Sequence, residues 1–381
     1  MSSIFFNFYV FLFDNKYGII SLMFSKISRK MNIIIAILIA FSMLSCSSNP
    51  NSTLNHSPME VKMYKEKEMN ESDSASIIDG VLIDKNFGEG YKDIVIFSTN
   101  DSFSSYNDNL GYASIKHYID NFDRNENFVT LVDTGNFSTG NAIAIKSKGK
   151  SSIEIMNAIG YDIVVPGSHE FDYGLDTFYE NMEMLDSDIL CCNIYDVNKK
   201  TLSFIPYVIY RYDKTNVAFI GVTSPDVLYD EKNRNYFFDS NGNQLLYFFE
   251  DEDGTMLYNQ IQACVDSAKS EGADKVVLLS HLGIEGVETK WSSTQVIANT
   301  KDIDAVIDGH SMEVLDNGLM TNKIGSFVPL VQAGSHLTNL GAMNITKDGY
   351  AYPAVMKERS VNTKDEEFQK FIDNVIEKYN N

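Results

Sequence analysis

The chain has 381 residues, of which 44% are hydrophobic and 22% are charged. At about 150 residues a domain this length predicts two or three domains, and the composition excludes a wholly disordered, collagen-like or multi-span membrane chain. Acidic residues outnumber basic ones by 52 to 31, a formal net charge of −21. Nucleic acid is therefore not an expected partner, because its phosphates would be repelled. Four cysteines are too few for a disulfide framework.

The N-terminal segment has the pattern of an export signal. Basic residues at 26, 29 and 30 precede an uncharged apolar run over 31–45, which is too short to span a bilayer comfortably and is typical of a secretory signal. The run ends at Leu44-Ser45-Cys46, which resembles the lipobox of bacterial lipoproteins, in which the cysteine is lipidated and becomes the mature N-terminus. We expect translation to start at Met31 and the mature chain to be an exported lipoprotein, anchored to a membrane of the cell envelope through Cys46. A plain cleaved signal and an N-terminal anchor helix are the alternatives.

Composition divides the chain into four parts. Residues 1–45 are the upstream segment and the signal. Residues 46–90 are rich in Ser, Asn, Lys and Glu, which predicts a polar tether with one short strand near 81–83. Residues 91–360 form the main domain, and 361–381 are a C-terminal helix.

From residue 93 onward, short β-branched runs alternate with helical stretches. Apolar strands that alternate with helices predict a layered α/β domain. The predicted strands are 94–98, 129–133, 163–166, 189–193, 204–210, 217–222, 276–280, 305–308, 328–333 and 340–345, and the predicted helices are 114–122, 151–159, 175–184, 256–271, 292–299 and 365–378.

Polar residues follow several of these strands directly. Ligands of open α/β sheets bind at the carboxyl ends of the strands, and Asp, Asn and His are ligands suited to Mn, Zn or Fe. The sequence therefore indicates a metal site at this edge. The polar segments are Thr99-Asn100-Asp101, Asp133-Thr134-Gly135-Asn136, Gly167-Ser168-His169-Glu170-Phe171-Asp172, Ser280-His281 and Asp308-Gly309-His310-Ser311.

In this order the segments resemble the motifs of the metallophosphoesterase (calcineurin-like) domain of bacterial 5′-nucleotidases and UDP-sugar hydrolases. The resemblance covers residues 93–345 and is most specific at GSHEFDYG and at SHLG followed by DGHS. It implies an α/β fold, a four-layer α-β-β-α sandwich of two mixed sheets, and a metal-dependent phosphoric-ester hydrolase. Family nucleotidases also carry a C-terminal domain that clamps the nucleoside. Because this chain ends at 381, we do not expect nucleotide specificity to follow from the resemblance.

Four positions depart from the family's ligand types. Asp101 is kept in the first motif, but Phe103 stands where the family has histidine. Asn136 stands at the aspartate that bridges the two metals, Ser168 at an asparagine ligand, and Met312 at the last histidine. A bridging carboxylate offsets the repulsion of two cations about 3.5–4 Å apart, and a neutral amide offsets little of it. We therefore expect no dinuclear centre.

The remaining family positions carry ligand or acid–base residues. Asp101, Asn136, His281 and His310 are the metal-ligand candidates, and we expect at most one weakly bound divalent ion (Mn, Zn or Mg) on the last three. By resemblance, His169 protonates the leaving group and Asp172 orients it.

The other histidines and the cysteines have simpler interpretations. The sequence leaves open whether His336 faces the cleft, while His117 is expected on a surface or in packing and His56 in the tether. Three cysteines are expected to be buried thiols: Cys191, Cys192 and Cys264.

Two functions remain. The favoured one is an exported 5′-nucleotidase-like lipoprotein with an eroded site, weak or no phosphohydrolase activity, and a role in binding a small phosphorylated ligand or a surface partner. The alternative is an active phosphoric-ester hydrolase that uses a reduced or single-metal site.

Overall fold

The computed structural model describes residues 77–78, 81–286, 288–357 and 360–381. The signal, the lipidation candidate Cys46 and His56 lie outside the described residues. The short strand expected near 81–83 is present as β2 (Val81–Asn86).

The larger sheet is mixed and has eight strands in the order β1-β2-β9-β10-β12-β13-β15-β14. From β10 to β15 its strands run parallel, whereas β9 and β14 pair antiparallel with their neighbours β10 and β15. Its strands are β1 (Ile77–Ile78), β2, β9 (Tyr207–Tyr212), β10 (Thr215–Thr223), β12 (Lys275–His281), β13 (Ala305–Ile307), β15 (Phe327–Ala333) and β14 (Val314–Thr321).

The second sheet is also mixed and has six strands in the order β17-β16-β3-β4-β5-β6. β3 to β6 run parallel, and β16 is antiparallel to both β3 and β17. Its strands are β17 (Ala351–Lys357), β16 (Asn339–Ile345), β3 (Asp93–Thr99), β4 (Asn127–Asp133), β5 (Ile163–Val164) and β6 (Asp188–Ile189).

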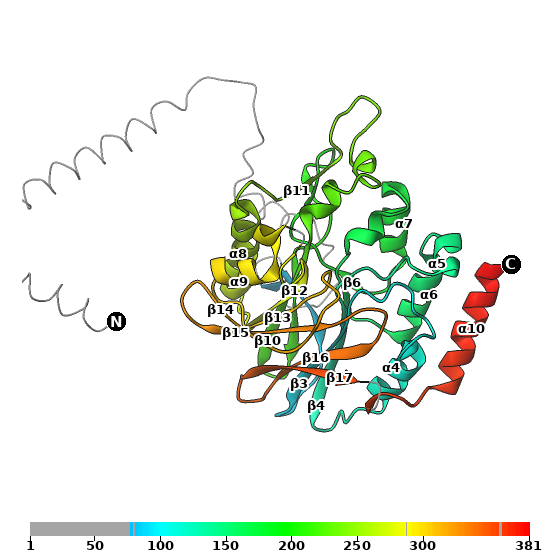
Figure 1. Ribbon diagram of the computed structural model, residues 1–381. Helices are drawn as coiled ribbons and strands as arrows, with labels where there is room; N and C mark the ends of the chain where they lie inside the picture. The colour runs from blue at the N-terminus through cyan, green and yellow to red at the C-terminus, as the bar shows by residue number, and fades with distance from the viewer. Residues whose placement is uncertain (1–76, 79–80, 287, 358–359) are drawn as a thin grey trace, which may run out of the picture. The chain divides into compact units, whose positions relative to one another are not determined.

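The two sheets pack face to face and helices cover both outer faces (Figure 1). One buried cluster joins the sheets, with Ile96 and Val132 from the smaller sheet and Phe219 and Val277 from the larger. Separate clusters lie under the outer helices. This is the predicted four-layer α-β-β-α sandwich, and that prediction is confirmed. The helices are α8 (Thr255–Ser270) and α9 (Ser293–Asn299) on the larger sheet, and α4 (Gly111–Asp120), α5 (Ala142–Ser147), α6 (Lys150–Ile159), α7 (Leu175–Met184) and α10 (Glu366–Asn380) on the smaller.

The strand predicted at 189–193 is wrong as a single element. The backbone N–H of Leu190 donates to Val164 in the smaller sheet, and that of Cys192 donates to Gly221 in the larger sheet. The chain crosses from one sheet to the other within three residues, so its apolar run serves both. It then enters a small sheet of β11 (Leu246–Phe248), β7 (Ile194–Asp196) and β8 (Thr201–Leu202).

Several elements were not predicted. The edge strand β14 carries Asp316, Asn317 and Gly318, residue types that are depleted in strands, and it is held by pairing to β15 alone. The six-residue helix α5 is too short for a clear period, and it is capped at its N-terminus by the side chain of Asn141.

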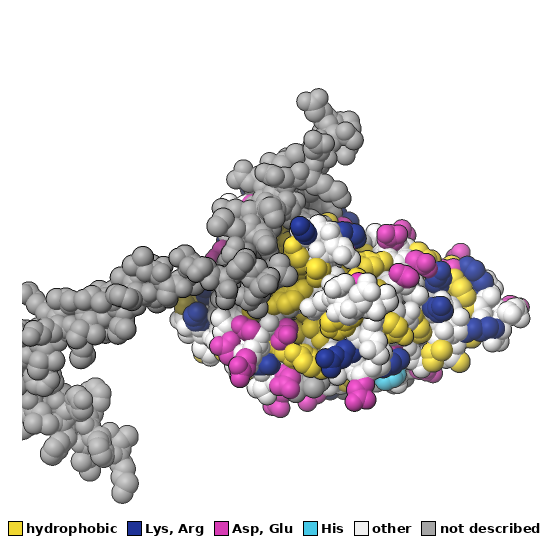
Figure 2. Space-filling view, turned by 90° about the horizontal axis from the view of Figure 1, so that it is seen from above, with side chains coloured by type: hydrophobic (Ala, Val, Ile, Leu, Met, Phe, Trp, Pro, Cys, Tyr) yellow, Lys and Arg dark blue, Asp and Glu magenta, His cyan; other side chains and the backbone are white. Residues whose placement is uncertain are grey.

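The charged side chains on the surface are distributed as the acidic composition leads one to expect. On the face in Figure 2, Lys and Arg side chains are scattered among Asp and Glu rather than gathered in one patch. Among the described residues, no helix is both long and apolar enough to cross a membrane. Cys191, Cys192 and Cys264 are buried free thiols, as expected.

Candidate active site

The polar segments predicted at the strand ends meet at one place. β3, β4 and β5 are parallel neighbours in one sheet, and β12 and β13 are parallel neighbours in the other. Seven non-glycine residues in the loops after β3, β4 and β13 adopt left-handed backbone conformations with φ of 45° to 76°: Asp101, Phe103, Ser104, Asn109, Asn136, His310 and Met312. Such conformations are uncommon outside glycine and cluster at functional sites.

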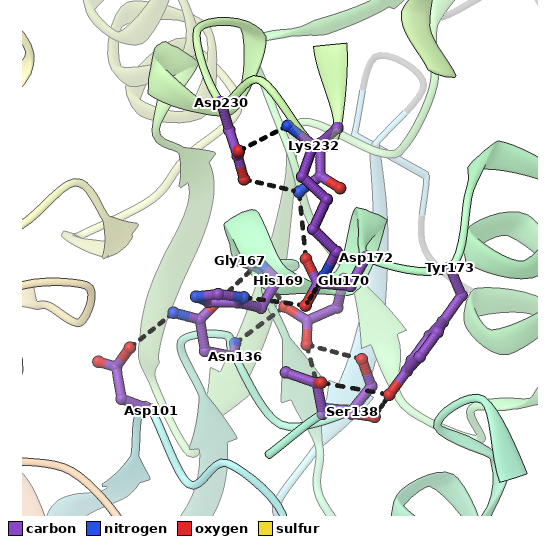
Figure 3. Close-up of polar contacts among 12 residues, drawn as sticks. Asp101, Asn136, Ser138, Gly167, His169, Glu170, Asp172, Tyr173, Asp230 and Lys232 are labelled. Atoms are coloured by element: carbon purple, nitrogen blue, oxygen red, sulfur yellow. Dashed lines mark hydrogen bonds and ion pairs between the residues drawn. The ribbon is translucent and has the colours of Figure 1, made fainter. Parts of the chain in front are cut away.

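Asp101 and Asn136 are joined directly. The side-chain amide of Asn136 donates to Oδ1 of Asp101 over 2.7 Å (Figure 3), and the amide oxygen of Asn136 accepts from the backbone N–H of His169 over 2.9 Å. A carboxylate only accepts and a backbone N–H only donates, so these two bonds fix which end of the amide faces Asp101. Oδ2 of Asp101 accepts from the side chain of Asn100 and from the backbone N–H of His310. Both oxygens of this fully buried carboxylate are therefore bonded to protein donors.

Two glycines allow this close packing. A Cβ on Gly167 would lie 2.5 Å from Oδ1 of Asn136, and a Cβ on Gly135 would lie 2.7 Å from Nδ1 of His281. Any larger residue at either position would push the strand-end loops apart.

His281 is buried and neutral. Its Nδ1 donates to the carbonyl of Thr134 over 2.5 Å, and burial lowers the pKa of His281 to about 4. Nε2 therefore carries a lone pair, and this buried atom has no hydrogen-bond partner among the described residues. A histidine that donates one ring nitrogen to a carbonyl and keeps the other free has the arrangement of a metal ligand.

His310 is paired with an aspartate that the sequence analysis did not single out. The two histidine rings of His281 and His310 lie 4.9 Å apart, but Nε2 of His310 donates to Oδ2 of Asp226 over 2.8 Å. Burial opposes the charge of this histidine, yet the bond to Asp226 prevails and raises the pKa of His310. Burial likewise acts to raise the pKa of Asp226, and His310 outweighs it, so that pKa is lowered.

His169 and Asp172 form the predicted pair. Nδ1 of His169 donates to Oδ2 of Asp172 over 3.1 Å, and Nζ of Lys232 lies 3.0 Å from the same oxygen. The hydrogen bond to Asp172 raises the pKa of His169 against the opposing effect of burial. Burial would raise the pKa of Asp172, but bonds from His169, Lys232 and Asn233 lower it to about 2. The imidazole of His169, which is 41% exposed, lies at the open end of this pair.

Glu170 holds the loops together. Its buried carboxylate accepts backbone N–H groups from Asn136, Phe137 and Ser138 after β4 and from Gly167 after β5 (Figure 3). Burial raises the pKa of Glu170, although these backbone bonds act to lower it. Glu170 therefore has the contacts of a structural residue that positions Asn136.

Besides Asn136, three positions depart from the family's ligand types, and of these Phe103 donates its backbone N–H to the carbonyl of Asn136 over 2.9 Å. The ring of Phe103 lies between two imidazoles, 5.4 Å from His169 and 5.0 Å from His336, so His336 borders the site while its side chain remains exposed. Met312 is 45% exposed, and Ser168 begins the short 3₁₀ helix η2 (Ser168–Phe171).

Residues 99–314, more than half of the chain, match the family model described as calcineurin-like phosphoesterase. The chain belongs to the calcineurin-like phosphoesterase family. The resemblance expected from the strand-end motifs is thereby confirmed. Members of this family generally use divalent metal ions.

Several relatives that this chain resembles in sequence are nucleotidases. Bovine 5′-nucleotidase is 27% identical over 257 residues, which cover 62% of this chain and 41% of the bovine protein. The 2′,3′-cyclic-nucleotide 2′-phosphodiesterase/3′-nucleotidase of Haemophilus influenzae is 29% identical over 211 residues, 49% of this chain and 30% of that protein. The chain thus spans about two-fifths or less of the length of these relatives. The calcineurin-like phosphoesterase YfkN from Bacillus subtilis has the same fold, with a TM-score of 0.60 at 22% identity over 76% of this chain and 99% of that structure.

The donor set does not fit the two metal ions of such a phosphoesterase. Both oxygens of Asp101 and both ends of the Asn136 amide are already bonded within the protein, and Nε2 of His310 is bonded to Asp226. Of these four candidate ligands, His281 has a buried side-chain atom, Nε2, that no donor or acceptor among the described residues contacts. Among the described residues, no group of three or more His, Cys, Asp or Glu side chains is arranged to hold a metal ion.

Sequence reasoning missed Asp226, Lys232 and Asn233. Asp226 follows β10 within the segment Thr223-Ser224-Pro225-Asp226, so the rule used for the other strands would have found it. Lys232 and Asn233 come from a loop with no strand before it, and no signal in the sequence places them against Asp172.

Proposed function

We propose that this chain is an exported, nucleotidase-like member of the family that binds a small phosphorylated ligand and hydrolyses phosphate esters weakly or not at all. The observation that carries the proposal is the 2.7 Å hydrogen bond from Asn136 to Asp101. By the family resemblance, Asp101 and Asn136 would both face a metal ion. Here an N–H group of Asn136 points at Asp101 instead.

The charge of the residue at position 136 favours ligand binding over hydrolysis by two metal ions. Two dications about 3.5–4 Å apart need a shared anionic ligand. The amide of Asn136 is neutral, and its N–H end faces Asp101. Without both ions, a water molecule loses its activating Lewis acid, and the developing charge on a phosphate loses most of its stabilisation.

The residues that remain suit the binding of an anion. His169 and His310 both have raised pKa values, because each is bonded to an aspartate. Lys232 adds an ammonium group beside Asp172. Ammonium and imidazole N–H groups donate to phosphate oxygens, and the half-exposed ring of His169 is accessible from solvent.

A second candidate is a hydrolase that works with one metal ion. The free, buried Nε2 of His281 favours it. When bound there, an ion would supply a Lewis acid for the phosphate, and His281, His310 and Asn136 are the residues that would hold it. His310 would first have to give up its bond to Asp226 if it ligated through Nε2.

Turnover of p-nitrophenyl phosphate with added Mn²⁺ or Zn²⁺ tests the proposal, with binding of inorganic phosphate measured by calorimetry. The matched comparison is a variant that restores the family ligands: Phe103→His, Asn136→Asp, Ser168→Asn and Met312→His together. We expect phosphate binding by the parent and turnover only in the restored variant. Parent turnover that equals the restored variant's and is abolished by His169→Ala would instead establish the hydrolase.

The lipid anchor is part of the same proposal and is supported by the signal pattern before Cys46. Cells grown with a labelled fatty acid should label the parent protein and not Cys46→Ser. An unlabelled parent would refute the anchor and leave the proposed ligand site unaffected.

A further inference from the structure

A pocket lies beside the strand-end site, which it meets at Asp226. It has a volume of about 420 Å³, which is within the range of sites for small organic ligands. Three carboxylates, one lysine and two aromatic rings line it: Asp226, Tyr229, Asp230, Glu288, Lys290 and Trp291. In Figure 3, Asp230 lies above the His169–Asp172 pair, on the side away from Asp101.

Asp226 connects the pocket to the strand-end site. Its Oδ2 accepts from His310 over 2.8 Å, while its buried Oδ1 has no hydrogen-bond partner among the described residues. A buried carboxylate oxygen without a donor is costly. A ligand that brings a positive charge or an N–H group to this side of Asp226 would remove that cost.

The aromatic wall already holds a cation. The rings of Tyr229 and Trp291 stack with centroids 5.6 Å apart, and Nζ of Lys290 lies 4.6 Å from the centroid of the Trp291 ring. Aromatic faces attract cations through their quadrupole. Trp291 is 2% exposed, whereas Tyr229 is 60% exposed, so the face that remains for a ligand belongs to Tyr229.

The charge of the lining selects the ligand. Asp226 is bonded to His310, which leaves the carboxylates of Asp230 and Glu288 against one ammonium group in the lining. This excess of negative charge favours a cation and disfavours a second phosphate. The neighbouring site, by contrast, presents the ammonium group of Lys232 and the half-exposed imidazole of His169, both beside Asp172. A ligand that spans both would carry a phosphate at one end and a positive charge at the other.

We propose that this pocket binds the ammonium group of a phosphorylated amino alcohol whose phosphate occupies the strand-end site. The proposal rests on the proposed function for the phosphate half of the ligand. The ammonium half depends only on the pocket.

Calorimetric titration of the intact protein separates the two halves. The probes are phosphocholine, glycerol 3-phosphate, inorganic phosphate and tetramethylammonium. Phosphocholine should bind about tenfold more tightly than glycerol 3-phosphate, as expected for a cation placed on an aromatic face beside carboxylates. Equal affinities for the two esters would overturn the proposal.

Three variants and one control locate the binding site of the ammonium group. Tyr229→Ala and Glu288→Gln should each reduce the preference for phosphocholine to about threefold or less, and Glu285→Gln, an exposed carboxylate outside the pocket, should leave it unchanged. Lys290→Met should strengthen phosphocholine binding, because it removes the competing ammonium group. An unchanged preference in both Tyr229→Ala and Glu288→Gln would contradict the assignment of the pocket.

The same titrations distinguish failure of the proposed function from failure of the ammonium pocket. When neither ester nor inorganic phosphate binds, the proposed function is refuted. The titration with tetramethylammonium then tests whether the pocket binds a cation. Binding of tetramethylammonium that Tyr229→Ala weakens supports the pocket, and no binding of it overturns the inference.

Discussion

The side-chain amide of Asn136 donates a hydrogen bond to the carboxylate of Asp101 across the ends of β4 and β3. These are the positions at which the family resemblance implies a shared aspartate and a metal ligand. The bond joins the two strand-end loops directly. Most of the expected behaviour of the site follows from this bond.

Asn136→Asp should destabilise the metal-free protein. The variant would place a second carboxylate against Asp101 in a fully buried position, and an uncompensated buried charge costs about 3–5 kcal/mol. Added Mn²⁺ should recover part of this loss, because a cation can lie between two carboxylates. Thermal unfolding with and without Mn²⁺ measures both effects, and the exposed substitution Asn125→Asp is the control. A variant as stable as the parent without Mn²⁺ would argue against a close Asn136–Asp101 contact.

His169 should titrate above its ordinary pKa of 6.5. Because the folded pKa is raised, the stability gained from the charged imidazole is present in full below pH 6.5 and is lost as the pH rises through the folded value. Asp172→Asn should move the titration of His169 downward, and Asp176→Asn, an exposed substitution four residues further along, should not. NMR of the ring protons reports the shift; an unshifted His169 in Asp172→Asn would rule out the pair.

Asp172 should also contribute to acid stability. Its pKa is lowered from 3.8 to about 2, so its contribution is present above pH 3.8 and is lost as the pH falls through about 2. At about 1.4 kcal/mol for each pKa unit, the contribution at neutral pH is on the order of 2 kcal/mol. Urea unfolding of the parent and Asp172→Asn should differ by this order at pH 7 and converge near pH 2. A gap that stays constant over this range would mean that the charge of Asp172 is not its source.

Glu170→Gln should destabilise the fold more than loss of surface charge does. The carboxylate accepts backbone N–H groups from four residues, and an amide would turn a donor toward some of them. We expect a loss of about 2–4 kcal/mol in the free energy of unfolding. Urea denaturation measures it against Glu183→Gln, an exposed site. Equal midpoints for the two variants would contradict the structural role given to Glu170.

The layered fold could be predicted because local pattern and tertiary packing agree there. The run Ile94–Ser98 is buried on both faces, with Ile94 and Ile96 between the sheets and Val95 and Phe97 under the helices. The helix α7 has the bounds that its period predicts. The edge strand β14 could not be predicted, because pairing with β15 stabilises residues of poor strand propensity. The prediction of one strand at 189–193 is wrong because the backbone hydrogen bonds of this segment are divided between the two sheets.

The site could be predicted in part from the same strand-end rule. This rule placed Asp101, Asn136, His281 and His310 at one edge, and the family resemblance paired His169 with Asp172. It could not predict that Asn136 bonds to Asp101, because this depends on the close approach that Gly135 and Gly167 allow. Nor could it predict Lys232, which a loop distant in sequence brings to Asp172.

The metal content of the protein tests the account most directly. The intact protein and the fourfold restored variant would each be incubated with excess Mn²⁺ or Zn²⁺ and passed through a desalting column. Inductively coupled plasma mass spectrometry would then give the number of ions per chain. The account predicts one ion or fewer per chain in the parent and about two in the restored variant. Two tightly held ions per chain in the parent would contradict it, since the amide of Asn136 would then be acting as the bridge that we argue it cannot be.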